Sequence, residues 1–139
     1  MIAFDTDVFV ELLAGDEKYV QRAREIPSAE QSIPIVVVEE LVRGRLNTIR
    51  QAESGKSKVG VARAYQLFEE TVSHFSDLRL LSFTTEAEAA FHAWRAQKIR
   101  VATHDLRIAA ICVAHSATLI SRNRRDFERI PDLVAEFWD

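Results

Sequence analysis

Three acidic residues stand at positions where their carboxylates could act together. Asp5 directly follows the short apolar run Ile2–Phe4, whereas Glu40 and Asp105 fall in the first turns of two predicted helices. An acid that closes a buried strand loses hydration, so it needs hydrogen bonds or a cation to offset that loss. Acids in a first helical turn also complement the helix dipole, which alone would explain Glu40 and Asp105. As a set, the three predict a functional site.

The segments that position these acids alternate between short apolar runs and stretches of helical periodicity. The predicted strands are Ile2–Phe4, Ile33–Val36, Leu78–Ser82, Thr118–Ser121 and Leu133–Phe137. The predicted helices cover residues 8–13, 17–26, 39–51, 59–75, 86–98 and a segment that follows Thr103 as its N-cap. Strands separated by helices predict an α/β sandwich, in which a central parallel sheet of four to five strands is flanked by helices. Asp5 would then lie at the carboxyl ends of the strands, where such sheets bind ligands.

The composition limits the class of protein. A chain of 139 residues fits a single domain over residues 1–139, and its net charge of -3 gives no overall attraction to nucleic acid, although a local basic patch would be enough. Cys112 is the only cysteine, so no disulfide framework and no thiolate zinc site is expected. No signal-like leader and no membrane-length apolar run is present, and we expect a cytoplasmic protein.

Four blocks of sequence, taken in order, resemble the signatures of the PIN domain. These blocks are Phe4–Phe9, Glu40–Gly44, Asp105–Ala110 and Ser121–Phe127. Within that family, the chain resembles the VapC toxins of bacterial toxin–antitoxin pairs, and the ending Phe127–Pro131 with Phe137 and Trp138 is similar to theirs. The blocks run from one end of the chain to the other, so their order makes the match specific.

The resemblance implies an endoribonuclease that depends on Mg²⁺ or Mn²⁺, with Asp5, Glu40 and Asp105 as three members of an acidic quartet. Oxygen ligands without cysteine or paired histidine favour such hard cations. The expected reaction is hydrolysis of an RNA phosphodiester by a water that the cation activates, with a 5′-phosphate and a 3′-hydroxyl as products.

The fourth acid of the family falls at Asn123, where this chain has a carboxamide. Asn123 can still offer an oxygen to the metal, and Asp126 could supply the missing charge. By the same resemblance, hydroxyls at Thr6 and Ser121 support the site, and Asp7 adds negative charge close to it.

The same resemblance predicts the partners. We expect an RNA substrate, with transfer RNA a common target in the family, a cognate antitoxin protein that binds near the acidic groove, and a homodimer. Basic residues form three groups in the sequence, from Arg43 to Arg63, at Arg95, Lys98 and Arg100, and at Arg122, Arg124 and Arg125. Such groups could follow an RNA backbone, and Arg43, Arg122 and Arg124 are the leading candidates for contact with RNA. Arg43 is better explained as a solvated surface residue, whereas for Arg122 and Arg124 the two explanations are equally good.

Other interpretations remain open. Because of Asn123, a PIN fold that binds RNA or a partner without cutting it is the main alternative, and a purely structural partner-binding domain is a third. A haloacid-dehalogenase phosphotransferase would also begin with Asp5-Thr6-Asp7, but Phe9 stands where that motif has threonine or valine. A receiver domain would need its phosphoacceptor aspartate at the end of a third strand, and none is found there.

Overall fold

Five parallel strands form a single sheet in the structure, a computed structural model that describes all 139 residues. Its strand order is β3-β2-β1-β4-β5, and the strands are β1 (Ile2–Phe4), β2 (Gln31–Pro34), β3 (Leu80–Leu81), β4 (Thr118–Ser121) and β5 (Ala135–Phe137). Ala3 of β1 pairs with Ser32 on one side and Leu119 on the other. The parallel sheet predicted from the sequence is confirmed, with all five strands present.

The chain separates into two compact units. The first comprises residues 1–37 and 79–139 and contains the whole sheet, and the second comprises residues 38–78. The helices of the first unit are α1 (Thr6–Ala14), α2 (Glu17–Arg24), a 3-10 helix (Ser28–Glu30), α5 (Thr85–Ala96), α6 (Thr103–Ala114) and α7 (Arg124–Phe127).

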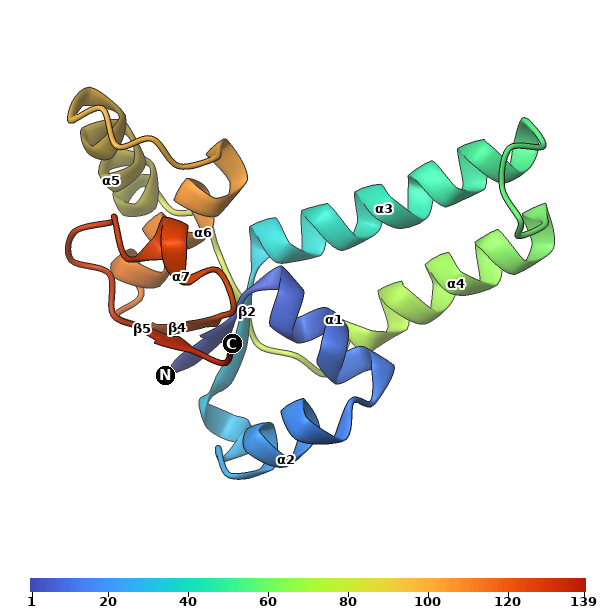
Figure 1. The fold of residues 1–139 in the computed structure, drawn as a ribbon, viewed down its shortest axis with the longest axis horizontal. Helices are drawn as coiled ribbons and strands as arrows, with labels where there is room; N and C mark the ends of the chain where they lie inside the picture. The colour runs from blue at the N-terminus through green and yellow to red at the C-terminus, as the bar shows by residue number, and fades with distance from the viewer. The chain divides into compact units, whose positions relative to one another are not determined.

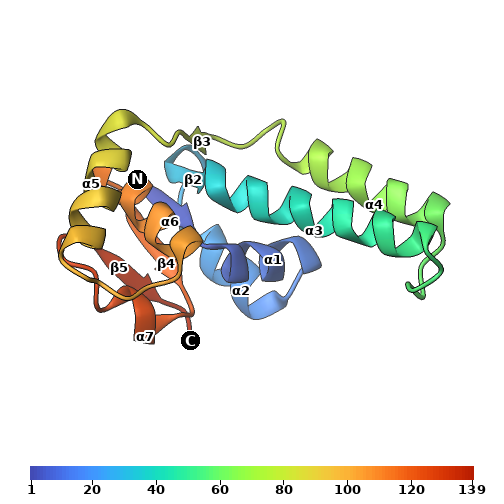
Figure 2. The same cartoon turned by 90° about the horizontal axis from the view of Figure 1, so that it is seen from above.

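Helices cover both faces of this sheet. α1 and α2 connect β1 to β2, whereas α5 and α6 connect β3 to β4 and so cross the sheet in the opposite direction. Because crossovers between parallel strands are right-handed, the two pairs lie on opposite faces, as Figures 1 and 2 show. This arrangement is the predicted α/β sandwich.

The core of the first unit is built from the inner strands and α6. Six of the seven residues from Leu106 to Cys112 of α6 are fully buried, all except Arg107, and so are Leu119 and Ile120 of β4. Strands covered on both faces are apolar throughout, which explains why Ala3 and Phe4 are both buried. Any polar group placed among them, such as Asp5, is forced into the same dry environment.

Two predicted boundaries are wrong. The predicted strand Ile33–Val36 ends at Pro34, and α3 (Ile35–Glu53) begins within the β-branched run Ile35–Val38, where tertiary packing overrides a strand preference. The predicted N-cap of α6 is also wrong, because Ala102 occupies the cap position without a side-chain bond and Thr103 is already helical.

The second unit consists of two helices, most of α3 and all of α4 (Val61–His74), which run side by side in both views (Figures 1 and 2). Arg45 Nε of α3 donates to Thr71 Oγ1 of α4 at 2.9 Å, and Thr71 is buried. Ile49 and Ala64 supply buried apolar contacts from the two helices.

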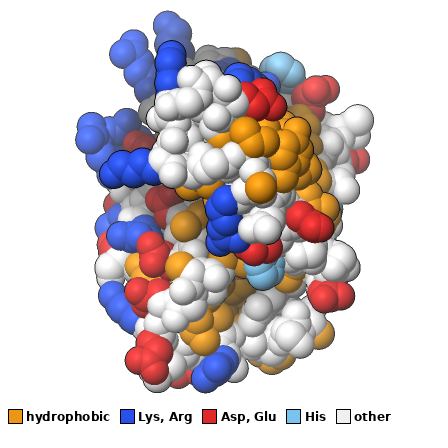
Figure 3. Space-filling view, turned by 90° about the vertical axis from the view of Figure 1, so that its right-hand side faces the viewer, with side chains coloured by type: hydrophobic (Ala, Val, Ile, Leu, Met, Phe, Trp, Pro, Cys, Tyr) orange, Lys and Arg blue, Asp and Glu red, His pale blue; other side chains and the backbone are white.

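The surface is mixed in character. On the face shown in Figure 3, acidic and basic side chains are interspersed and hydrophobic side chains gather in patches between them. None of the helices combines the length and the apolar character that a membrane crossing requires.

Candidate functional site

Asp5 lies at the junction between β1 and α1 and is the N-cap of α1. Its backbone N–H donates to Ile120 O of β4 at 2.9 Å, which continues the parallel pairing beyond the last strand residue. One carboxylate oxygen, Oδ1, accepts from the N–H of Thr6 at 2.8 Å, and the other, Oδ2, accepts from Ser121 Oγ at 2.6 Å. Each oxygen therefore has one fixed donor, and the orientation of the carboxylate is determined.

The environment of Asp5 disfavours its negative charge. The residue is only 4% exposed, and burial raises the pKa of its carboxyl from 3.8 to about 7. The hydrogen bonds from Ser121 and Thr6 lower this pKa, whereas the charges of Asp105 and Asp7 raise it further. Around Asp5 the structure thus gathers neutral donors and like charges, and a bound cation would offset both the desolvation and the repulsion.

Asp105 reaches the same place from another element. It lies in the first turn of α6, which packs against β2 and β4, and its carboxylate is close enough to Asp5 for their charges to interact. Asp7 lies in the first turn of α1 and is exposed. The charges of Asp7 and Asp105 both raise the pKa of Asp5, which agrees with the prediction that the three residues lie near one another.

Ser121 connects Asp5 to the segment that follows β4. The N–H of Asn123 donates to Ser121 Oγ at 3.0 Å, so the hydroxyl proton of Ser121 is available for Asp5. Ser121 is fully buried, as the last residue of β4. The Ser121 hydroxyl donates to the Asp5 carboxylate, which agrees with the supporting role expected of it. Thr6 donates through its backbone N–H, and the role expected of its hydroxyl stays a prediction.

Asn123 and Asp126 contact each other. Asn123 is the N-cap of α7, and its Oδ1 accepts from the N–H of Asp126 at 3.4 Å. Asn123 Nδ2 donates in return to Asp126 Oδ2 at 3.0 Å. This short helix was not predicted from the sequence, although a capping residue followed three positions later by an acid is a recognisable signal for a helix start.

Glu40 belongs to the second unit. It lies in the second turn of α3, six residues beyond the end of β2, and its side chain is partly buried. Its participation in a site with Asp5 and Asp105 stays a prediction.

The three arginines predicted to contact RNA all have acidic neighbours. Arg43 pairs with Glu39 at 2.8 Å, and Arg122 pairs with Glu11 at 3.6 Å. Arg124 binds both carboxylate oxygens of Asp139, at 2.9 and 3.2 Å. Their contact with RNA stays a prediction, and each would have to share its charge with a carboxylate.

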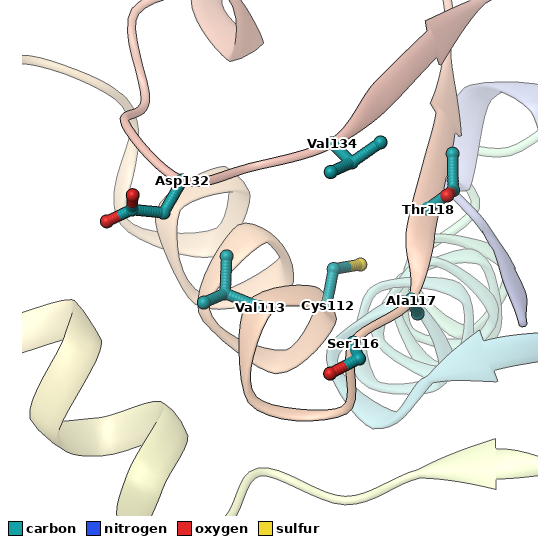
Figure 4. A pocket seen from close by; sticks show the side chains of 7 residues that line it. All are labelled: Cys112, Val113, Ser116, Ala117, Thr118, Asp132 and Val134. Carbon is teal, nitrogen blue, oxygen red and sulfur yellow. The ribbon is translucent and has the colours of Figure 1, made fainter.

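A pocket of about 240 Å³ lies elsewhere in the first unit, at the amino ends of β4 and β5. Cys112, Thr118, Asp132 and Val134 are among its lining residues, and the carboxylate of Asp132 points away from the sulfur of Cys112 (Figure 4). Burial raises the pKa of the Cys112 thiol well above its ordinary value. The thiol is therefore a protonated core group, as predicted from its place on an apolar helix face.

The donor set suits a hard cation that keeps much of its water. Within either unit, no three His, Cys, Asp or Glu side chains lie close enough together to form a protein cage for a metal. Mg²⁺ in proteins is commonly held by one or two carboxylates, with water and substrate phosphate as the other ligands. The paired carboxylates of Asp5 and Asp105 fit that requirement, whereas a structural zinc site would need more protein ligands.

Comparisons with known proteins agree with this architecture. Residues 2–133 match the family model of the PIN domain. Ribonuclease VapC2 of Rickettsia felis is 26% identical over 112 residues, which cover 78% of this chain and 74% of that protein. The crystal structure of VapBC2 from Rickettsia felis, bound to a DNA fragment from its promoter, contains a chain that is 25% identical, with a TM-score of 0.77 and full coverage of both chains. DNA-bound VapBC from Salmonella typhimurium also contains a similar chain, with a TM-score of 0.73, 20% identity and full coverage of both chains. The family model spans both compact units and includes every predicted site residue, and this chain belongs to the PIN domain family.

Proposed function

We propose that this protein is an Mg²⁺- or Mn²⁺-dependent endoribonuclease and the toxin of a toxin–antitoxin pair. The observation that carries the proposal is the buried carboxylate of Asp5, which neutral donors hold in one orientation beside Asp105. A carboxylate with these surroundings is better suited to binding a cation than to stabilising the fold. The similarity to Ribonuclease VapC2 supports the choice of RNA as substrate.

Asp5 and Asp105 are the proposed carboxylate ligands, with Glu40 as the third acid of the site. When bound there, the cation would lower the pKa of a water molecule and neutralise charge on the scissile phosphate. Ser121 and the N–H of Thr6 keep the Asp5 carboxylate from rotating, so that its oxygens stay aimed at one position.

We propose Asn123 and Asp126 as the residues at the fourth metal-binding position. To bind a metal there, they must first break the hydrogen bonds that they make with each other. The Asn123 carboxamide oxygen already accepts from the Asp126 N–H, and the Asp126 carboxylate already accepts from Asn123. We therefore expect substitution of Asn123 or Asp126 to reduce cleavage less than substitution of Asp5.

The expected partners are an RNA substrate, with transfer RNA among the candidates, an antitoxin protein and a second copy of the chain. The similar chains in the crystal structures come from VapBC complexes, which supports the expectation of an antitoxin.

A cleavage assay tests the proposal directly. Purified protein is incubated with total RNA and Mg²⁺ or Mn²⁺, and the new ends are mapped; Asp5→Asn and Asp105→Asn are compared with Asp16→Asn, which changes the exposed N-cap acid of α2. We expect cleavage by the wild type and by Asp16→Asn, with 5′-phosphate products, and no cleavage by the site variants. RNA binding without any product at any concentration of either metal would contradict the proposal in favour of a non-cutting PIN fold, the alternative raised by Asn123.

A further inference from the structure

The corner where α5 meets α6 carries a group of cations without acidic partners. This basic corner consists of Arg95, Lys98, Arg100 and Arg107, and none of the four forms an ion pair with a carboxylate. By contrast, each of Arg43, Arg122 and Arg124 forms an ion pair with a carboxylate. The basic corner is therefore a group of neighbouring cations that are not paired with carboxylates, and three of its members, Arg95, Lys98 and Arg100, already form a basic group in the sequence.

Two of these guanidinium groups are held in place by the same aromatic ring. Arg95 Cζ lies 5.2 Å from the centroid of Phe91, and Arg107 Cζ lies 5.4 Å from it. Phe91 is itself buried, so it orients the two cations and offers no face on which a nucleic-acid base could stack. Like charges held near one ring repel each other, and a bound anion nearby would relieve that repulsion.

A third contact ties this pair to the acidic site. Arg95 Nη2 donates to Thr103 Oγ1 at 2.7 Å, and Thr103 is the first residue of α6. Asp105 lies in the same helical turn, so the Arg95 guanidinium is fixed within a few residues of a proposed metal ligand. The Thr103 hydroxyl, which was expected to cap α6, therefore accepts a hydrogen bond from Arg95.

The end of α5 places a further cation at the corner at a conformational cost. Lys98 has a φ of 61°, in the left-handed region that favours glycine. Its N–H donates to Arg95 O and the N–H of Ile99 donates to Trp94 O, the bonding pattern that usually has glycine at the Lys98 position. The left-handed conformation at this position favours glycine, yet the chain has a lysine there, which adds a positive charge to the corner.

We propose that this basic corner binds the phosphate backbone of single-stranded RNA next to the Asp5–Asp105 site. The inference rests on the proposed ribonuclease function, which it extends by assigning the surface that holds the substrate. Fixed guanidinium groups match phosphate oxygens, and the Phe91 ring that orients them is buried, which favours contact with the backbone over the reading of bases. Arg95 and Arg107 are substrate-positioning residues on this assignment.

The test measures binding apart from cleavage. Every protein carries Asp5→Asn and is kept in EDTA, and a short fluorescein-labelled single-stranded RNA is titrated by anisotropy at several salt concentrations. The test variant is Arg95→Gln with Arg107→Gln. The control, Arg24→Gln with Arg63→Gln, removes the same charge from exposed residues of α2 and α4. Thermal unfolding verifies that both variants are folded.

Loss of two backbone contacts should lower the slope of log K against log salt by about 1.4 and weaken binding about tenfold near 0.15 M salt. The control should keep the parental slope. Equal losses in the two variants, or no loss in either, would overturn the inference. A second titration uses labelled poly-glutamate as an acidic peptide. If the test substitutions weaken binding of this peptide while RNA binding stays at the parental level, the inference is also overturned, because that result would identify an acidic protein segment as the occupant.

The outcome is separable from that of the proposed function. Metal-dependent cleavage by the wild type together with an unchanged salt slope in the test variant would refute the basic corner and leave the ribonuclease intact. A reduced slope without any cleavage by the wild type would support the RNA surface and refute the enzyme.

Discussion

Replacing Asp5 with asparagine should change how the stability of the protein depends on pH. In the folded protein, burial raises the pKa of this carboxyl from 3.8 to about 7. The folded state therefore binds a proton more tightly than the unfolded chain does. The stability that this proton contributes is fully present below about pH 4 and is lost as the pH rises through about 7.

The size of the effect follows from the pKa shift. A shift of one pKa unit corresponds to about 1.4 kcal/mol, so a rise from 3.8 to about 7 corresponds to about 4 kcal/mol at alkaline pH. Asparagine at this position cannot ionise, and its carboxamide oxygen can still accept from one of the two donors, Ser121 Oγ or the Thr6 N–H. The other donor loses its acceptor at a cost of about 1–3 kcal/mol, which does not depend on pH.

Urea unfolding of the wild type and of Asp5→Asn in EDTA, at pH values from about 4 to 9, measures the effect. The free energy of unfolding of the wild type minus that of the variant should fall by about 4 kcal/mol between the lowest and the highest pH. Adding Mg²⁺ at the highest pH should restore stability to the wild type and leave the variant unchanged, because a ligand that binds only the folded state stabilises it. If the difference in free energy of unfolding between wild type and variant stayed constant with pH, it would refute the claim that Asp5 is buried without a cation to offset its charge.

Three further outcomes follow from particular contacts. Ser121→Ala leaves Asp5 Oδ2 and the N–H of Asn123 without their partner, so we expect a loss of about 1–3 kcal/mol in urea unfolding and a fall in kcat that exceeds any rise in KM. Unchanged kcat would contradict the positioning role. Trp138, which is 2% exposed, packs against Phe4 and accepts a hydrogen bond from Tyr19 at its carbonyl, so Trp138→Ala should cost about 3–5 kcal/mol, whereas Tyr19→Phe should cost only about 1 kcal/mol. The Trp138→Ala variant keeps the carbonyl that accepts from Tyr19, so a loss of only about 1 kcal/mol in that variant would contradict the packing role of the indole ring. The Cys112 thiol, buried and with a raised pKa, should not react with a thiol reagent at pH 8 until the protein is unfolded, and rapid reaction of the folded protein would show that the core opens there.

Much of the architecture was predictable because the inner strands and helices carry strong local signals. Ile2–Phe4 and Thr118–Ser121 were predicted with the bounds that the structure gives them, since each is a short apolar run between clear breaks. Gly15 ends α1 in the left-handed conformation, with a φ of 77°, as expected of a glycine after the last apolar turn. Apolar patterns and helix-ending residues of this kind act over a few residues, so they can be recognised from the sequence alone.

The boundaries that were wrong depend on packing. Ile35–Val38 is a β-branched run that favours a strand locally, yet the chain turns into α3 there. Thr103 is a good capping residue by type, yet its hydroxyl accepts from Arg95 on the neighbouring helix. The first outcome is decided by tertiary packing, and the second by a contact with a residue eight positions earlier on the preceding helix, so neither follows from the local preference of the residues concerned.

By itself, the sequence determined which residue types are available for chemistry: the acids at positions 5, 40 and 105, a carboxamide at 123 and a lone, core-type cysteine. The tertiary structure decided how those groups are used. It placed the Ser121 hydroxyl 2.6 Å from Asp5 across 116 residues of sequence, and it paired Asn123 with Asp126 at the start of α7. It also left the cations of the α5–α6 corner without acids while pairing Arg43, Arg122 and Arg124. The physical reason is that desolvation, hydrogen-bond direction and charge pairing depend on distances between atoms, which exist only once the strands and helices have packed.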